Sequence, residues 1–251
     1  MITDPWSILI AVVAVTFLGL AKGGLAGIGM AATPLMALVL PPLQAVAVLL
    51  PILIVQDVIS VWTYRRTFSG WNLKIMLPGA VLGVAAAWVL AAHVSDALLR
   101  ILVGSIGVAF VLNGWLRKRP AAASKPTTLG GAFWGGLAGF TSTLVQAGSP
   151  PLQIHLLPQK LPKLTFVGTN MIFFAVINWI KVVPYLGLGQ FSSQTLTTSL
   201  MLLPLAVATN FLGIWLVRIM PNEAFYRFAY LLMFVISLTL IGQAAVNLSR
   251  A

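Results

Sequence analysis

Long uncharged runs constrain this chain more than any other feature. Charged side chains are missing from eight stretches: 5–21, 23–56, 75–95, 101–116, 126–159, 164–180, 182–217 and 228–249. Charged residues make up 8% of the chain, where a soluble domain carries ~25%. Hydrophobic residues make up 59%, and the mean hydropathy is +1.00. A water-soluble fold would lack the polar residues to cover its surface. The sequence therefore predicts an integral membrane protein.

The runs predict an all-α, polytopic transmembrane bundle, because a helical crossing needs ~20 apolar residues. Uninterrupted helices are expected at 43–64, 72–92, 96–116, 164–184, 193–217 and 222–248. Two further regions, 5–40 and 128–158, are interrupted by Gly, Ser, Thr and Pro at 21–29 and 141–151. The first apolar stretch lacks a basic segment before it, so we expect it to stay in the membrane rather than be removed as a signal peptide.

The two halves of the chain resemble each other. The hydrophilic segment 117–127 separates a first transmembrane repeat, 1–116, from a second, 128–251. Three residues recur 127 positions later: Trp88, Asp96 and Arg100 correspond to Trp215, Glu223 and Arg227. Such self-similarity is typical of duplication. Each repeat is expected to hold one broken, re-entrant hairpin and three helices.

Basic residues predict how the two repeats are oriented. If each interrupted region turns back as a hairpin, eleven basic residues fall on one side and three on the other, with Lys22 uncounted. If each region crosses once, the numbers are nine and five. The positive-inside rule favours the hairpins, and hence two inverted, pseudo-symmetric repeats. Parallel repeats remain the alternative.

Two breaks at matching positions predict a ligand site at mid-depth, because broken helices persist in lipid only where the freed backbone finds partners. Glycine allows close approach of a ligand, and a resuming helix presents free N–H groups to an anion. Hydroxyl and amide side chains there could add donors or only join helices. The candidate substrate-binding residues at the breaks are Gly23, Gly24, Gly29, Thr33, Ser142, Gln146, Gly148 and Ser149.

Lys22 is the sharpest single candidate, since a lysine within a span is costly. Its ammonium could bind an anion, or the side chain could snorkel to the interface. Asp57, beside Gln56, could carry a coupling proton or orient Lys22. We expect instead that it pairs with Arg65 or lies at the interface.

One later helix carries further polar residues. Asn170 and Asn178 share a helical face and are candidates for substrate contact, with Lys181 as a possible coupling residue. Asp96 with Arg100, and Glu223 with Arg227, have the four-residue spacing of structural ion pairs at helix starts.

The composition disfavours other functions. Without Cys, and with two His and four acids, no metal site or cofactor is expected. No catalytic motif stands out, so an enzyme is not expected. The basic residues lie between apolar runs rather than on one face, which argues against nucleic-acid binding. Nothing in the sequence indicates an oligomeric state. An anion channel and a proton-coupled carrier of another organic anion remain alternatives to an anion exporter.

The motifs resemble the TauE/SafE sulfite exporter family. The resemblance lies in Gly19–Gly29 followed by Pro34-Leu35, in Trp62–Arg66, in Gly135–Gly139 and in Pro150-Pro151. It implies a carrier in the cell inner membrane that exports sulfite or an organosulfonate such as sulfoacetate. The predicted mechanism is alternating access around the paired breaks, with the anion and the lipid bilayer as the partners.

Overall fold

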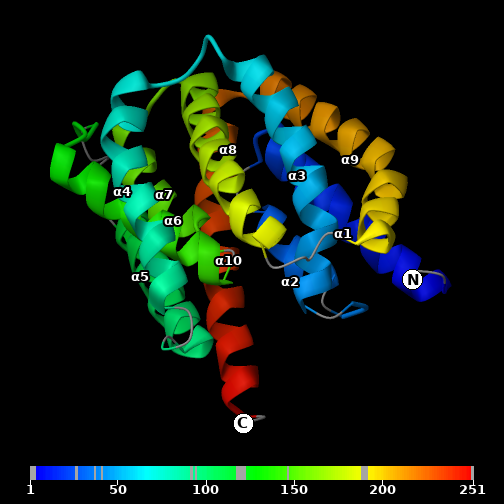
Figure 1. The fold of residues 1–251 in the computed structure, drawn as a ribbon. Helices are drawn as coiled ribbons and strands as arrows, with labels where there is room; N and C mark the ends of the chain where they lie inside the picture. Colours follow the sequence, from blue (N-terminus) through cyan, green and yellow to red (C-terminus); the bar gives the residue numbers. More distant parts are fainter. Residues whose placement is uncertain are drawn as a thin grey trace. The chain divides into compact units, whose positions relative to one another are not determined.

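The computed structural model describes residues 4–25, 28–36, 38–40, 42–90, 93, 95–116, 123–145, 147–187 and 192–249. These residues form helices and no strand (Figure 1). In chain order the helices are α1 (Pro5–Gly23), η1 (Ile28–Ala31), α2 (Ala32–Met36), α3 (Pro42–Tyr64), α4 (Gly70–Leu90), α5 (Asp96–Leu116), α6 (Thr128–Val145), α7 (Ser149–Leu156), η2 (Leu157–Gln159), α8 (Lys163–Gly187), α9 (Ser193–Ile219) and α10 (Asn222–Ser249).

The six uninterrupted helices predicted from the sequence are α3, α4, α5, α8, α9 and α10. The two interrupted regions are the segments α1-η1-α2 and α6-α7-η2. Within the described residues, six helices are long and apolar enough to cross a membrane: α1, α3, α4, α8, α9 and α10. The prediction of an all-α, polytopic membrane bundle is thereby confirmed.

Helix starts follow local side-chain chemistry. Asp4 caps α1 by accepting a hydrogen bond from the Ser7 backbone N–H at 2.9 Å, and Pro5 fits the first turn. Ser192 and Thr195 form a capping box at the start of α9, each hydroxyl accepting from the other residue's backbone N–H.

The helices form two compact units, each of which combines both halves of the sequence. Unit 1 consists of Met1–Phe68 and Val167–Met220, and unit 2 of Ser69–Phe166 and Pro221–Ala251. In unit 1, α9 packs against α1 and α3; in unit 2, α4 packs against α6 and α5 against α10. The pairs α1–α9 and α6–α4 correspond to each other if the halves are repeats, as predicted. Whether the repeats are inverted stays a prediction.

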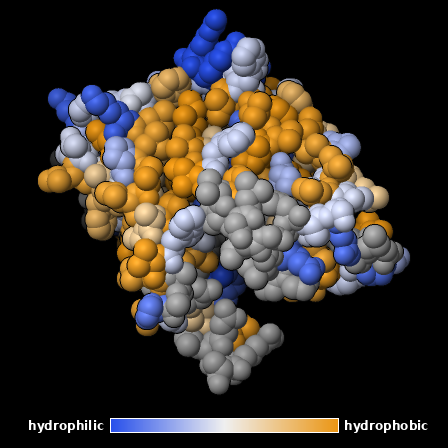
Figure 2. All heavy atoms as spheres, viewed as in Figure 1, coloured by the Kyte–Doolittle hydropathy of each residue, from blue (hydrophilic) through white to orange (hydrophobic). Residues whose placement is uncertain are grey.

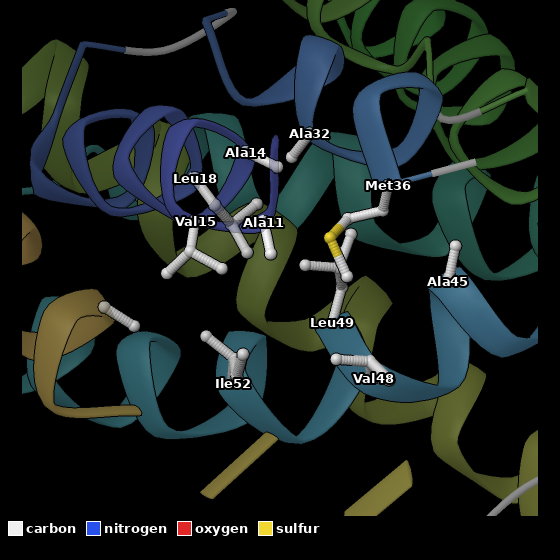
Figure 3. Close-up of a cluster of buried hydrophobic side chains, with 11 residues drawn as sticks. Ala11, Ala14, Val15, Leu18, Ala32, Met36, Ala45, Val48, Leu49 and Ile52 are labelled. Carbon is white, nitrogen blue, oxygen red and sulfur yellow. The ribbon is translucent and has the colours of Figure 1, made fainter. Parts of the chain in front are cut away.

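Small apolar side chains fill the core of unit 1 (Figure 3). Ala11, Val15 and Leu18 of α1 face Leu49 and Ile52 of α3. The remaining members are Ala14, Ala32, Met36, Ala45, Val48 and Ala206. Because several of these residues are alanines, the helix backbones can approach closely.

Many large hydrophobic side chains are exposed, including Leu82, Val89 and Leu129 of unit 2 and Trp62 and Met201 of unit 1. Hydrophobic residues also cover much of the face drawn in Figure 2. In water such a surface would promote aggregation, but in a bilayer it contacts acyl chains.

Glycines bring α4 and α6 into backbone contact. Gly79 and Gly83 of α4 face the carbonyl oxygens of Ala132 and Gly136, at 2.1 and 2.0 Å from the position that a Cβ atom would take. Gly139 of α6 lies in the same way against the Ala80 carbonyl oxygen. Four-residue spacing of small residues is typical of close helix pairs in membranes.

We predict that Gly83→Ala lowers the thermal stability of the purified protein, because its methyl group would overlap the α6 backbone and overpacking costs ~1–3 kcal/mol. The measurement is the midpoint of thermal aggregation in detergent. Gly242→Ala is the matched control in the same unit, because a Cβ there meets no atom within 4 Å. Equal midpoints for the two variants would contradict the close packing of α4 and α6.

Candidate functional site

The first break begins where α1 ends in a glycine turn. The Gly24 N–H donates to the Ala21 carbonyl at 3.0 Å, and the Leu25 N–H donates to the Leu20 carbonyl at 3.1 Å. This is the Schellman arrangement, which needs a left-handed residue. Gly24 supplies it with φ +129°. A Cβ there would also lie 2.8 Å from Val167 and 3.0 Å from Val217, so the position requires glycine.

Two hydroxyl groups of α3 bond to the last carbonyls of α1. The Ser60 hydroxyl donates to the Lys22 carbonyl at 2.6 Å, and the Tyr64 hydroxyl donates to the Gly23 carbonyl at 2.7 Å. A helix C-terminus leaves acceptors without partners, which is costly inside an apolar bundle. The last carbonyl oxygens of α1 are therefore already hydrogen-bonded to α3. The positive group at this break is the Lys22 ammonium.

Lys22 is 7% exposed and forms an ion pair with Asp57, which is 1% exposed. The second carboxylate oxygen of Asp57 accepts from the Asn178 amide at 2.9 Å. The interpretation of Lys22 as a side chain that snorkels to the interface is thus wrong. Asp57 instead orients Lys22, which was one of the roles open from the sequence.

The expected pair between Asp57 and Arg65 is not formed. Arg65 is exposed, donates to the Trp62 carbonyl at 2.6 Å and places its guanidinium 3.7 Å from the centre of the Trp62 ring. Over the exposed Trp62 ring the Arg65 guanidinium stays hydrated and gains a cation–π contact, so it is stable without the buried Asp57 carboxylate. Asp57 is turned inward, where Lys22 needs a partner.

Lys181 of α8 adds a second buried cation to unit 1. It is 4% exposed and interacts electrostatically with both Lys22 and Asp57. Asp57 attracts the Lys181 ammonium and Lys22 repels it. We call Lys22, Asp57, Asn178 and Lys181 the α1–α3–α8 cluster.

Buried amides lie in the same unit. Gln56 donates to the Ala206 carbonyl at 2.9 Å, and Asn210 donates to the Gln56 carbonyl at 3.4 Å and to Ser60 at 3.3 Å. Among the described residues, no hydrogen-bond partner meets Gln56 Oε1, Asn210 Oδ1 or either amide atom of Asn170, which is fully buried. Buried polar atoms without partners are uncommon, and an ordered water or a bound ion commonly satisfies such atoms.

The second break lies in unit 2. After α6 ends, the Ala147 N–H donates to the Thr141 carbonyl at 3.1 Å, and the Thr141 hydroxyl donates to the Ala147 carbonyl at 3.0 Å. Ser142, Gly148 and Ser149 are buried around this break, and α7 resumes at Ser149. The prediction that both regions are interrupted helices is confirmed.

A polar cluster ties the helix after the second break to α4. Asn72 Oδ1 lies 3.0 Å from His155 Nε2 and accepts from Gln159 Nε2 at 3.0 Å. The Asn72 amide donates back to Gln159 Oε1 at 2.8 Å. His155 is therefore a hydrogen-bonded residue that helps to hold α7 against α4.

The other predicted residues have different surroundings. Gly29 and Thr33 are half-buried in η1 and α2 of unit 1, and Gln146 lies outside the described residues. Two ion pairs were predicted at helix starts. In the first, Arg100 donates to Gln243 at 2.6 Å, and the side chain of its predicted partner Asp96 is not among the described ones. Glu223 and Arg227 are both exposed, so their pairing stays a prediction.

The candidate residues did not include Ser60, Tyr64 and Asn210. Their side chains nevertheless donate hydrogen bonds to the end of α1 and to Gln56. One signal was available for two of them. Gln56, Ser60 and Tyr64 follow each other at four-residue spacing and so share one face of α3. A polar stripe of this kind in an apolar helix indicates a polar neighbour, here the end of α1.

We predict that Lys22→Ala strongly destabilises the protein, because it leaves a buried carboxylate without its cation, at a cost of ~3–5 kcal/mol. The double variant Lys22→Ala/Asp57→Ala should recover part of this loss. Thermal aggregation in detergent measures both variants. Arg65→Ala, which removes an exposed cation, is the control and should change little. A double variant less stable than the single variant would refute the pairing.

We predict that Tyr64→Phe loosens the end of α1, because the Gly23 carbonyl loses its donor and a buried acceptor without a partner costs ~1–3 kcal/mol. Faster hydrogen exchange is expected in a peptide that covers 20–25. Tyr230→Phe is the matched control, because the Tyr230 ring stacks on Phe110 and its hydroxyl bonds to no described residue. Unchanged exchange in Tyr64→Phe would exclude the capping role.

Comparison with known proteins shows to which family the chain belongs. The family model described as "Sulfite exporter TauE/SafE" matches residues 11–240, which include both breaks and all or most of each long helix. No curated protein and no solved structure matches the chain. The match agrees with the resemblance seen in the glycine-rich motifs and with a bundle of membrane helices. The chain therefore belongs to the TauE/SafE sulfite exporter family and is a multi-pass membrane transporter rather than an enzyme.

Proposed function

We propose that this transporter exports sulfite or a small organosulfonate across the cell inner membrane, and that the α1–α3–α8 cluster binds the anion. The observation that carries the proposal is the burial of two lysines, Lys22 and Lys181, among the helices of unit 1. Lys22 is paired with Asp57, and buried amides lie in the same unit. A lysine buried among membrane helices is costly and usually marks a substrate path, so this arrangement favours an anionic guest.

Buried donors near the charges support the same function. A sulfur oxyanion presents several acceptor oxygens, and charge-assisted bonds to lysine and amide N–H groups are the strongest available. Asn170 shares a face of α8 with Asn178 and Lys181 and brings a buried amide without a described partner. We assign Asn170 as a further substrate contact, with Gly23, Gly24 and Gln56 shaping the wall.

Alternating access around the two breaks is the proposed mechanism. Each break interrupts the helical hydrogen bonds beside a glycine, and short helical segments follow it. Short segments of this kind can shift as rigid pieces and open a site to one side at a time. Gly29, Thr33, Ser142, Gln146, Gly148 and Ser149 are the residues we propose for this gating and for substrate contact at the breaks.

The direction of transport follows from the membrane potential. With the cell interior negative, each negative charge that leaves gains ~2.3 kcal/mol per 100 mV. Export of an anion can therefore proceed without a coupling ion. Uptake would need cation sites rich in acids, whereas the whole chain has four acidic residues.

We predict that the protein in vesicles releases labelled sulfite, faster when an inside-negative potential is imposed. Lys22→Arg should keep part of the rate because it keeps the charge, and Lys22→Ala and Lys181→Gln should lose most of it. Arg65→Ala, outside the cluster, should release sulfite at the normal rate. Full export by Lys181→Gln and Lys22→Ala would remove both lysines from the site. A rate that does not saturate with sulfite would indicate a channel rather than a carrier.

A further inference from the structure

Asn170 differs from the other buried amide side chains in the described part of the chain. It is fully buried in α8, and neither its amide nitrogen nor its amide oxygen has a hydrogen-bond partner among the described residues. Asn72, Asn178 and Gln159 are also buried, and each donates at least one side-chain hydrogen bond. A flip of the Asn170 amide would exchange its two polar atoms and leave both without a partner.

Two neighbours on α8 place Asn170 beside the first break. A Cβ on Gly24 would lie 2.8 Å from a methyl group of Val167, three residues before Asn170. The Asn178 amide, eight residues after Asn170, donates to Asp57 at 2.9 Å. Successive residues of an α-helix are about 100° apart, so Asn170 is about 60° from Val167 and about 80° from Asn178 around α8. Asn170 therefore belongs to the half of α8 that contacts Gly24 and Asp57, and lies between these contacts along the helix axis.

The burial of this amide has a cost that a guest can remove. A buried amide without a partner is unfavourable, and folded proteins satisfy nearly all such groups. Met171 and Phe173, close to Asn170 on α8, are buried and apolar, so they offer no hydrogen bond. A leucine of similar size would avoid the cost altogether. We therefore expect the Asn170 amide to meet a polar group of a guest.

We infer that Asn170 recognises a hydroxyl group of the transported anion. This inference rests on the proposed function and names its substrate class. An amide offers a donor and an acceptor, whereas the oxygens of a sulfonate or a carboxylate only accept. Such oxygens satisfy the Asn170 nitrogen and leave its oxygen without a donor. A hydroxyl group donates to the amide oxygen, while it or a sulfonate oxygen accepts from the amide nitrogen.

This recognition narrows the substrates. Hydroxyalkanesulfonates fit, and sulfite fits as hydrogensulfite, which has one O–H group. Sulfoacetate with an ionised carboxyl group presents acceptors only. It leaves the Asn170 oxygen without a donor and is therefore disfavoured.

Two probes of equal charge and nearly equal shape test the hydroxyl group alone. 2-Hydroxyethanesulfonate ends in a hydroxyl group, and propane-1-sulfonate has a methyl group in its place. Each competes with labelled ethanesulfonate in counterflow across vesicles that contain the protein. The hydroxyl compound should compete ~tenfold or more better, because a site built to bond a hydroxyl group rejects the analogue that lacks it. An apolar pocket would give the opposite order, since it favours the methyl group.

Variants of α8 test the assignment to Asn170. Asn170→Leu removes the hydrogen-bonding groups at similar size, so the hydroxyl compound should lose its advantage over propane-1-sulfonate. Met171→Leu is the matched control, because it alters the packing of the adjacent buried residue and keeps the amide. It should retain the wild-type preference. Elution as a single species in detergent establishes that each variant is folded, and Asn170→Ala takes the place of Asn170→Leu if the leucine variant fails this check.

The outcomes separate the inference from the proposed function. Equal competition by the two probes in the wild-type protein, or better competition by propane-1-sulfonate, overturns hydroxyl recognition and leaves anion transport standing. A folded Asn170 variant with the wild-type preference overturns the assignment to this residue. Absence of counterflow with ethanesulfonate, sulfite and both probes overturns the proposed function itself.

Discussion

The carbonyl groups at the end of α1 need hydrogen-bond donors inside an apolar bundle, and this need organises the site. The hydroxyls of Ser60 and Tyr64 supply them from one face of α3. Because α3 must lie against α1 for these bonds, Asp57, next to that face, comes into reach of Lys22. The ion pair and the helix break are therefore two consequences of one packing arrangement. If α1 continued as a helix, these carbonyl groups would accept hydrogen bonds from its own backbone. The hydroxyl groups of α3 would then have no acceptor there.

Much of the fold could be predicted, because the bilayer makes helix length and hydrophobicity decisive. The six uninterrupted helices and both breaks follow from uncharged runs, glycines and prolines. The partner of Asp57 could not be predicted in the same way. Arg65 is eight residues from Asp57 in sequence and Lys22 is thirty-five, so the sequence favours Arg65 as the partner. Only tertiary packing brings the more distant Lys22 to Asp57. Likewise, a repeated order of helices suggests two contiguous halves, whereas the compact units each draw helices from both.

The α1–α3–α8 cluster connects charge and packing in unit 1. The Asp57 carboxylate stabilises the buried Lys22 ammonium by an ion pair. The Asn178 amide donates to the second carboxylate oxygen of Asp57, which keeps the carboxylate turned toward Lys22.

The interleaving of the two units sets an order for assembly during synthesis. Unit 1 needs α9, yet 98 residues, 69–166, separate its first part from its second. At the roughly 5–20 residues per second of translation, α1 and α3 wait for α8 and α9 for tens of seconds or less. During that interval Lys22 and Asp57 are already both present and can neutralise each other, while Lys181 has not yet been made. The acid that pairs with Lys22 in the finished protein therefore also compensates the charge of Lys22 in the nascent chain.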